Sequence, residues 1–107
     1  MKVIITNAFS INMLPPEGAK VEFTPLAVPA VQMAMIKWGY HSSIGHANTA
    51  AVVSDILGMT VPANRKSITL DEETIVIVAQ YNGPRLEEGA KSLPPGAVIK
   101  FWGVYLV

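Results

Sequence analysis

The chain has 107 residues, half of them apolar and only 15% of them charged, which is enough to bury one hydrophobic core and predicts a single domain over residues 1–107. Its eight basic and eight acidic residues cancel, and this balance argues against binding to long nucleic acids, whose phosphates usually select proteins with a basic excess. Because the chain has no cysteine, disulfides, thiolate metal sites and thiol nucleophiles are excluded.

The first part of the chain predicts two short strands and one helix. Val3–Thr6 is a β-branched run that ends abruptly at an asparagine, which is typical of a short buried strand. A polar loop and a turn at Pro15–Gly18 follow, and the alternating residues Val21–Thr24 predict a second strand. Pro29–Trp38 predicts a helix, because proline suits a first helical position and a glycine follows the tryptophan.

The middle of the chain predicts a loop and a second helix. Tyr40–Gly45 has the composition of a loop. Asn48 or Thr49 is expected to cap a helix that runs to Leu57, because apolar residues then recur at spacings of three and four and a glycine follows.

The last part predicts the remaining strands. Lys66–Leu70 alternates polar and apolar residues, as a strand with one solvated face does, and Thr74–Gln80 is a continuous β-branched run typical of a central strand. Tyr81–Pro95 predicts a loop with at most one helical turn, and Ala97–Val107 predicts a final long strand. These elements predict an α/β domain with a mixed sheet of about five strands, covered by two or three helices.

Composition also bears on assembly and location. A surface with so little charge favours a homodimer, in which part of the apolar surface of each chain is covered by the other. The first residues contain too short an apolar stretch for a signal peptide, and no run reaches the ~18 apolar residues of a spanning helix. We therefore expect a cytoplasmic protein.

Polar side chains that could carry chemistry gather in three predicted loops. They are Asn7, Ser10 and Asn12 after the first strand; His41, Ser42, Ser43 and His46 before the second helix; and Arg85, Glu87 and Glu88 after the central strand. Each group also has an ordinary interpretation, as turn residues, helix-capping residues or a solvated charged patch. Residue types and spacing alone therefore leave open whether any group is a site.

The chemistry available to these groups is limited. The two histidines are five residues apart with no carboxylate nearby, which fits no zinc spacing and argues against a metal site. An imidazole can transfer a proton near neutral pH, and a guanidinium offers a planar fork to a phosphate. A few basic residues in one pocket could therefore hold a small anionic ligand despite the zero net charge.

Four segments resemble, in order and spacing, those of a known family. They are TNAFSINML at Thr6–Leu14, SSIGH at Ser42–His46, the pair Asn64-Arg65 before a predicted strand, and RLEEGAK at Arg85–Lys91. Together they span nearly the whole chain, and the first is long and unusual. In these segments the chain resembles the viral type III anti-CRISPR and CRISPR-associated ring nucleases, which degrade cyclic tetra-adenylate.

The resemblance implies a function and a set of site residues. His46, Arg85 and Glu88 would be catalytic, and Asn7, Ser10, Asn12 and Arg65 would bind the substrate. Ring nucleases use no metal or other cofactor: a ribose 2′-hydroxyl attacks the neighbouring phosphorus and the 5′-oxygen leaves. The products would be linear di-adenylates with 2′,3′-cyclic phosphate or 3′-phosphate ends, and loss of the cyclic messenger would switch off type III CRISPR signalling.

Two other functions remain open at this point. A non-catalytic sensor would bind the same cyclic oligoadenylate without cleaving it. A dimeric nucleic-acid-binding regulator would bind a duplex instead, although the zero net charge argues against it.

Overall fold

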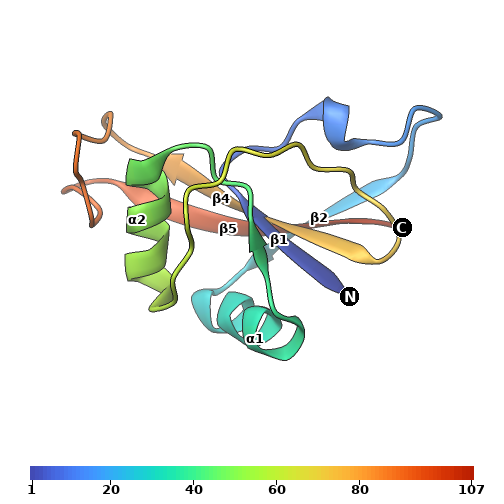
Figure 1. Cartoon of the computed structure of the whole chain (residues 1–107), viewed down its shortest axis with the longest axis horizontal. Helices are drawn as coiled ribbons and strands as arrows, with labels where there is room; N and C mark the ends of the chain where they lie inside the picture. Colours follow the sequence, from blue (N-terminus) through green and yellow to red (C-terminus); the bar gives the residue numbers. More distant parts are fainter.

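A five-stranded mixed sheet forms the middle of the molecule (Figure 1). Its strands are β1 (Lys2–Thr6), β2 (Val21–Leu26), β3 (His41–Ser42), β4 (Thr74–Asn82) and β5 (Val98–Leu106), in the spatial order β2-β5-β4-β1-β3. β1 is parallel to β3 and β4, whereas β5 is antiparallel to β4 and β2. The computed structural model describes all 107 residues, and they form the single α/β domain that the sequence predicts.

Two α-helices cover one face of the sheet, which we call the helical face. They are α1 (Val28–Trp38) and α2 (Ala47–Leu57), and α1 lies below the sheet in Figure 1. Twelve buried residues join both helices to the strands: Val3, Ile5, Val31, Met35, Ile44, Ala50, Val53, Leu57, Val61, Ile77, Ala79 and Phe101. Each helix has eleven residues, and neither has the length and apolarity needed to cross a bilayer.

Loops cover the opposite face, which we call the loop face. The segment between β1 and β2, with one short 3₁₀ helix (η1, Ile11–Met13), and the segment leading into β4 run along the upper side of the sheet in Figure 1. The buried core of this face has only six residues, Ile4, Ile68, Leu70, Val76, Val78 and Val104. Phe9 and Trp102 pack against it and are only partly buried.

The prediction of a strand at Lys66–Leu70 is wrong, although its alternating pattern has a structural basis. Ile68 and Leu70 are buried in the loop face, while the residues between and before them are exposed. The segment lies across the sheet and is anchored by the burial of these two side chains. One backbone hydrogen bond of 2.7 Å, from the amide of Leu70 to the carbonyl of Met13, also holds it. A half-buried extended segment and an edge strand therefore give the same sequence pattern.

The fifth strand is instead β3, which falls within the predicted loop Tyr40–Gly45. It has two residues and pairs with β1 in the register Ile4 to His41. β2 also runs further than predicted, through Pro25 to Leu26, which is possible because β2 is an edge strand and proline needs no ladder partner there.

Candidate functional site

The carboxyl ends of β1 and β3 bring the first two motif segments side by side. The amide of Ser43 donates to the carbonyl of Ile5 over 2.7 Å, and the hydroxyl of Thr6 donates to the carbonyls of Ser43 and Ala8, each over 3.4 Å. Thr6 is buried, so these bonds fix its position. The chain that follows Thr6 therefore leaves the sheet next to the chain that leads to His46.

The polar residues after β1 lie on an ordered loop. The hydroxyl oxygen of Ser10 accepts a 3.2 Å hydrogen bond from the amide of Asn12 and so caps η1. Asn7 and Ser10 are half-buried, and Asn12 is exposed. The hydroxyl hydrogen of Ser10 and the amide groups of Asn7 and Asn12 are thus available to a polar ligand.

The Asn64-Arg65 pair is bound to the SSIGH segment. Asn64 donates from its side chain to the carbonyl of Ser42 over 2.9 Å and from its backbone to the carbonyl of Ile44 over 2.8 Å. The side chain of Arg65 lies against Gly45, where an added Cβ would come within 3.3 Å of Arg65 Nε. Gly45 therefore lets the exposed Arg65 approach the backbone one residue before His46.

His46 lies at the amino terminus of α2, and this corrects the predicted start of that helix. His46 itself is the N-cap residue, in an extended conformation and with no side-chain capping bond, so neither Asn48 nor Thr49 caps the helix. The first amide groups of α2 lack partners within the helix and carry partial positive charge, which favours a bound anion. The imidazole is exposed beside them.

Asn48 has a different role, which connects the fourth segment to α2. Its side-chain oxygen accepts a 3.1 Å hydrogen bond from the amide of Gly89, in the loop between β4 and β5. Gly89 follows Glu88 directly, so this bond holds the loop that carries Arg85 and Glu88 against the first turn of the helix.

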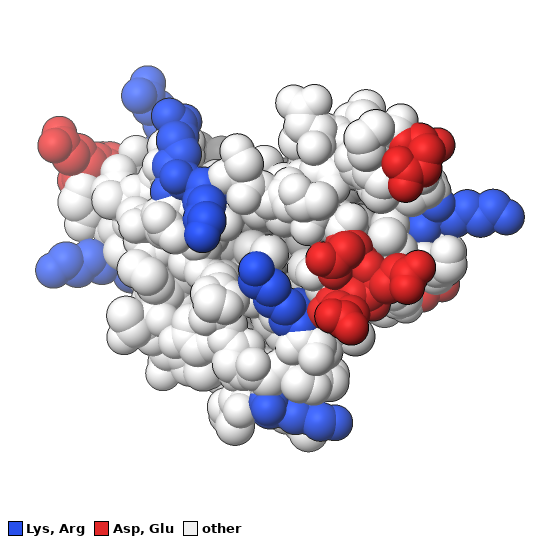
Figure 2. All heavy atoms as spheres, turned by 45° about the vertical axis from the view of Figure 1, so that its right-hand side comes forward, with Lys and Arg blue, Asp and Glu red and all other residues white.

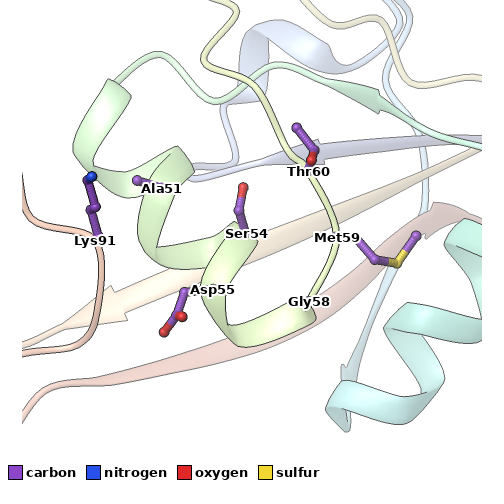
Figure 3. Close-up of a pocket in the computed structure, with 7 residues that line it drawn as sticks. All are labelled: Ala51, Ser54, Asp55, Gly58, Met59, Thr60 and Lys91. Atoms are coloured by element: carbon purple, nitrogen blue, oxygen red, sulfur yellow. The ribbon is translucent and has the colours of Figure 1, made fainter.

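The same loop continues along the flank of α2, where it closes one side of a pocket. Lys91 lies across from Ala51 and Asp55 of the helix in Figure 3. The pocket has a volume of about 460 Å³ and is lined by Ala51, Ser54, Asp55, Gly58, Met59, Thr60 and Lys91. The hydrogen bond at Asn48 and the pocket that Lys91 and α2 line together therefore place the loop beside the helix.

The four segments meet at one edge, but their side chains do not form a closed catalytic cluster. His46, Arg85, Glu87 and Glu88 are exposed, and none of the side-chain hydrogen bonds joins His46 to Glu88 or Arg85. No group of three or more His, Asp or Glu residues is arranged to hold a metal ion.

His41 lies apart from His46. It is exposed on β3 and lines a polar cavity of about 330 Å³ together with Ser42, Ser43 and Asn64 of the motif segments and with Lys2, Lys66 and Asp71. His46 does not line this cavity, so the two histidines, five residues apart in the sequence, do not share one pocket.

Charge distinguishes the two ends of the sheet. Figure 2 shows a surface that is mostly uncharged, with one patch of acidic side chains near its centre, further acidic side chains at two other places, and basic side chains dispersed. Glu17, Asp71, Glu72 and Glu73 line a shallow depression near the start of β4. Hydrogen bonds from the hydroxyl of Thr74 and the amide of Glu73 hold the pKa of Asp71 below its ordinary value. The exposed Arg65 and Arg85 follow the opposite ends of β3 and β4, and Arg85 shares its loop with Glu87 and Glu88.

Sequence reasoning missed three residues that assemble the site: Thr6, Asn48 and Asn64. Each bonds the backbone of a segment distant in sequence. Thr6 and Asn64 belong to the recognised motifs, and only their bonding role was missed. The single signal for Asn48 was its place in the first turn of a predicted helix, which suggested a cap instead.

Comparisons with known proteins identify the fold and the family. The sequence model of the STIV B116-like family matches residues 3–94. Among solved structures, B116 of Sulfolobus turreted icosahedral virus is similar in fold, with a TM-score of 0.78 and 24% sequence identity over 98% of this chain and 99% of that chain. A search of curated proteins gave no significant match.

Proposed function

This chain belongs to the STIV B116-like family, and we propose that it is a metal-independent ring nuclease that cleaves cyclic tetra-adenylate. One observation carries the proposal: four segments far apart in sequence meet at one edge of the sheet, where each contacts the SSIGH segment or the first turn of α2. The joining hydrogen bonds are made by Thr6, Asn64 and Asn48, and the segments that they hold together carry the exposed side chains of His46, Arg65, Arg85 and Glu88.

The edge of the sheet where the four segments meet has groups that can bind a phosphodiester. The amino terminus of α2 presents backbone amides to one phosphate, and Arg65 and Arg85 supply positive charge at the same edge. Asn7, Ser10 and Asn12 are uncharged donors and acceptors, which suit the ribose and phosphate oxygens of a ligand without adding a proton-transfer group.

The reaction needs no nucleophile from the protein. The 2′-oxygen of one ribose forms a bond to the neighbouring phosphorus, the bond from phosphorus to the 5′-oxygen breaks, and the 2′-hydroxyl proton passes to solvent. His46 donates a proton to the departing 5′-oxygen, Arg85 stabilises the charge on the phosphorane, and Glu88 orients His46 or a ribose hydroxyl. Each cleavage leaves a 2′,3′-cyclic phosphate and a 5′-hydroxyl. Two cleavages give linear di-adenylates and would end type III CRISPR signalling.

The symmetry of the ligand supports a homodimer. A ring of four identical nucleotides can lie on a twofold axis, so that two chains act on opposite phosphates. The chain has apolar surface that a partner could cover: Met33 and Ile36 on α1 are 71% and 74% exposed, and Trp38 is 41% exposed. Calorimetry on an inactive variant is expected to give one ring bound per two chains.

Incubation with cyclic tetra-adenylate in excess chelator, followed by separation of the products, tests the proposal. We expect linear di-adenylates from the natural ring and none from a ring with 2′-deoxyriboses, because the attacking hydroxyl is then missing. Cleavage of the 2′-deoxy ring would indicate attack by water, and activity restored only by added magnesium would exclude the metal-free route. Binding without cleavage would make the chain a sensor of the ring.

A further inference from the structure

A second pocket, on the loop face, plays no part in the reaction proposed above. It has a volume of about 330 Å³ and is lined by Phe9, Phe23, Val78, Gln80, Trp102 and Val104. We call it the aromatic pocket. Val78 and Val104 are buried and form its base, while three aromatic side chains surround them. Gln80 is exposed and is the only lining side chain that can both donate and accept hydrogen bonds.

The aromatic pocket lies near the same sheet edge as the candidate site. Val78 pairs with Thr6 in the ladder between β4 and β1, and Gln80 comes two residues further along β4. Phe9 comes three residues after Thr6, between Asn7 and Ser10. A ligand held by the loop after β1 is therefore close to the rings that line the pocket.

Folding does not use all of the aromatic surface in this pocket. Phe23 is 50% exposed on the edge strand β2, and its ring meets that of Phe9 edge to face, with centroids 5.3 Å apart. Leaving a large aromatic side chain half in water forgoes much of the free energy that its burial would provide. The exposed surface is thus available to a flat aromatic ligand.

We propose that the aromatic pocket binds one adenine base of the cyclic oligoadenylate. This inference rests on the proposed function and names the part of the ligand that the loop face recognises. The base stacks on the aromatic side chains, and the amide of Gln80 pairs with its edge, since a glutamine amide can bond the 6-amino group and N7 of adenine together. The only side-chain bond of Gln80 in the structure is a long one, 3.4 Å to the carbonyl of Tyr81, so its amide is free to turn to a ligand.

Tryptophan fluorescence tests the stacking directly. The chain has two tryptophans, so Trp38→Phe leaves Trp102 as the single reporter and Trp102→Phe leaves Trp38, which lies on α1. In a His46→Ala background, to prevent turnover, cyclic tetra-adenylate is expected to quench Trp102 and to leave Trp38 unchanged. Quenching of Trp38 alone, or of neither residue when the ring is bound, would overturn the inference.

Base specificity tests the role of Gln80. In the same inactive background, Gln80→Ala is expected to weaken binding of cyclic tetra-adenylate by about tenfold or more, because it removes the paired hydrogen bonds to the base. A cyclic tetra-inosinate ring, which lacks the 6-amino group, is expected to bind weakly to the Gln80 protein and equally weakly to Gln80→Ala. An unchanged preference for adenine in Gln80→Ala would place the base elsewhere.

The two proposals fail in different ways. If calorimetry shows no binding of cyclic tetra-adenylate to the His46→Ala protein with Gln80 intact, the proposed function fails and this inference fails with it. If the ring binds and is cleaved by the wild type, but Trp102 is not quenched and Gln80→Ala binds the ring as tightly as the Gln80 protein, only the aromatic pocket is wrongly assigned. Both residues are exposed or partly exposed, so their substitution is compatible with folding.

Discussion

The two faces of the sheet are built differently, and the candidate site lies where they meet. The helical face is covered by two regular helices over a core of twelve buried residues, whereas the loop face is covered by irregular chain over a core of six. The helical face contributes His46 at the end of a rigid helix, and the loop face contributes Asn7, Ser10 and Asn12. This division assigns the proposed proton donor to the helical face and the proposed uncharged hydrogen-bonding groups to the loop face.

The largest effect is expected when the contribution of the helical face is removed. His46→Ala should lower kcat by ~10²–10⁴-fold with little change in ring affinity, because a proton donor acts in the transition state. Asn12→Ala, on the loop face, should instead cost about 2- to 10-fold in kcat/KM, the worth of one hydrogen bond. Single-turnover rates and calorimetry separate the two effects.

His41→Ala is the matched control for this comparison, because His41 is the other histidine of the chain, has no role implied by the resemblance, and should leave turnover unchanged. Equal losses in His46→Ala and Asn12→Ala would contradict the division of roles between the faces. Full activity in His46→Ala would show that His46 is not the proton donor, and the matched motifs offer no other candidate for that role.

A stability measurement compares the packing of the two faces. Leu57, in α2, and Leu70, in the segment over the loop face, are each only 1% exposed. Substitution of a buried leucine by alanine costs about 2–5 kcal/mol, and the cost is larger where the surroundings cannot close the cavity. We expect Leu57→Ala to lie in the upper part of that range and Leu70→Ala in the lower part, because irregular chain relaxes more easily than a helix. Urea unfolding measures both, and a larger loss at Leu70 would show that the loop face is equally rigid.

The sequence predicted the helical face better than the loop face, for physical reasons. α1 begins one residue from its predicted start, because Pro29 and the glycine after Trp38 mark its ends, and β1 and β4 match closely, because their buried residues form continuous β-branched runs. For the loop face, the prediction of a strand at Lys66–Leu70 was wrong, because alternating burial arises there without strand pairing. β3 was missed because two residues, paired through their backbone, leave no pattern of side chains.

The site could be predicted as segments but not as geometry. Resemblance supplied the four segments and their residues, and the structure brings the segments together. The bond from Gly89 to Asn48 could not have been foreseen, since it joins residues 41 apart in the chain and Asn48 reads as a helix cap. Such long-range contacts depend on the packed fold, which local sequence patterns do not contain.

A smaller effect is expected from the contact between the loop and α2. Asn48→Ala removes the acceptor for Gly89, and the net worth of such an exposed hydrogen bond is about 0.5–1.5 kcal/mol. The loop that carries Arg85 and Lys91 should then open more often, so limited trypsin digestion after these residues should be a few-fold faster. Asn48→Asp keeps a side-chain oxygen at the same place and should be cut at the wild-type rate. Equal cutting of Asn48→Ala and the wild type would show that the loop is held by other contacts.

The smallest effect is expected at Asp71, where the segment over the loop face turns into β4. Its carboxylate accepts hydrogen bonds from Thr74 Oγ1 (2.7 Å) and the amide of Glu73 (2.9 Å), and these bonds lower its pKa in the folded protein. A lowered folded-state pKa stabilises the protein above the pKa of the unfolded chain, and this stabilisation is lost as the pH falls through the folded-state value. Asp71→Asn should therefore lower Tm slightly at pH 7, and the difference from the wild type should shrink as the pH falls below the ordinary pKa of an aspartate.

Glu72→Gln is the control, because it removes one negative charge from the same turn without removing these hydrogen bonds. Its difference in Tm from the wild type should change less with pH. A difference between Asp71→Asn and the wild type that stays constant down to low pH would mean that the ionised carboxylate of Asp71 does not stabilise this turn of the loop face.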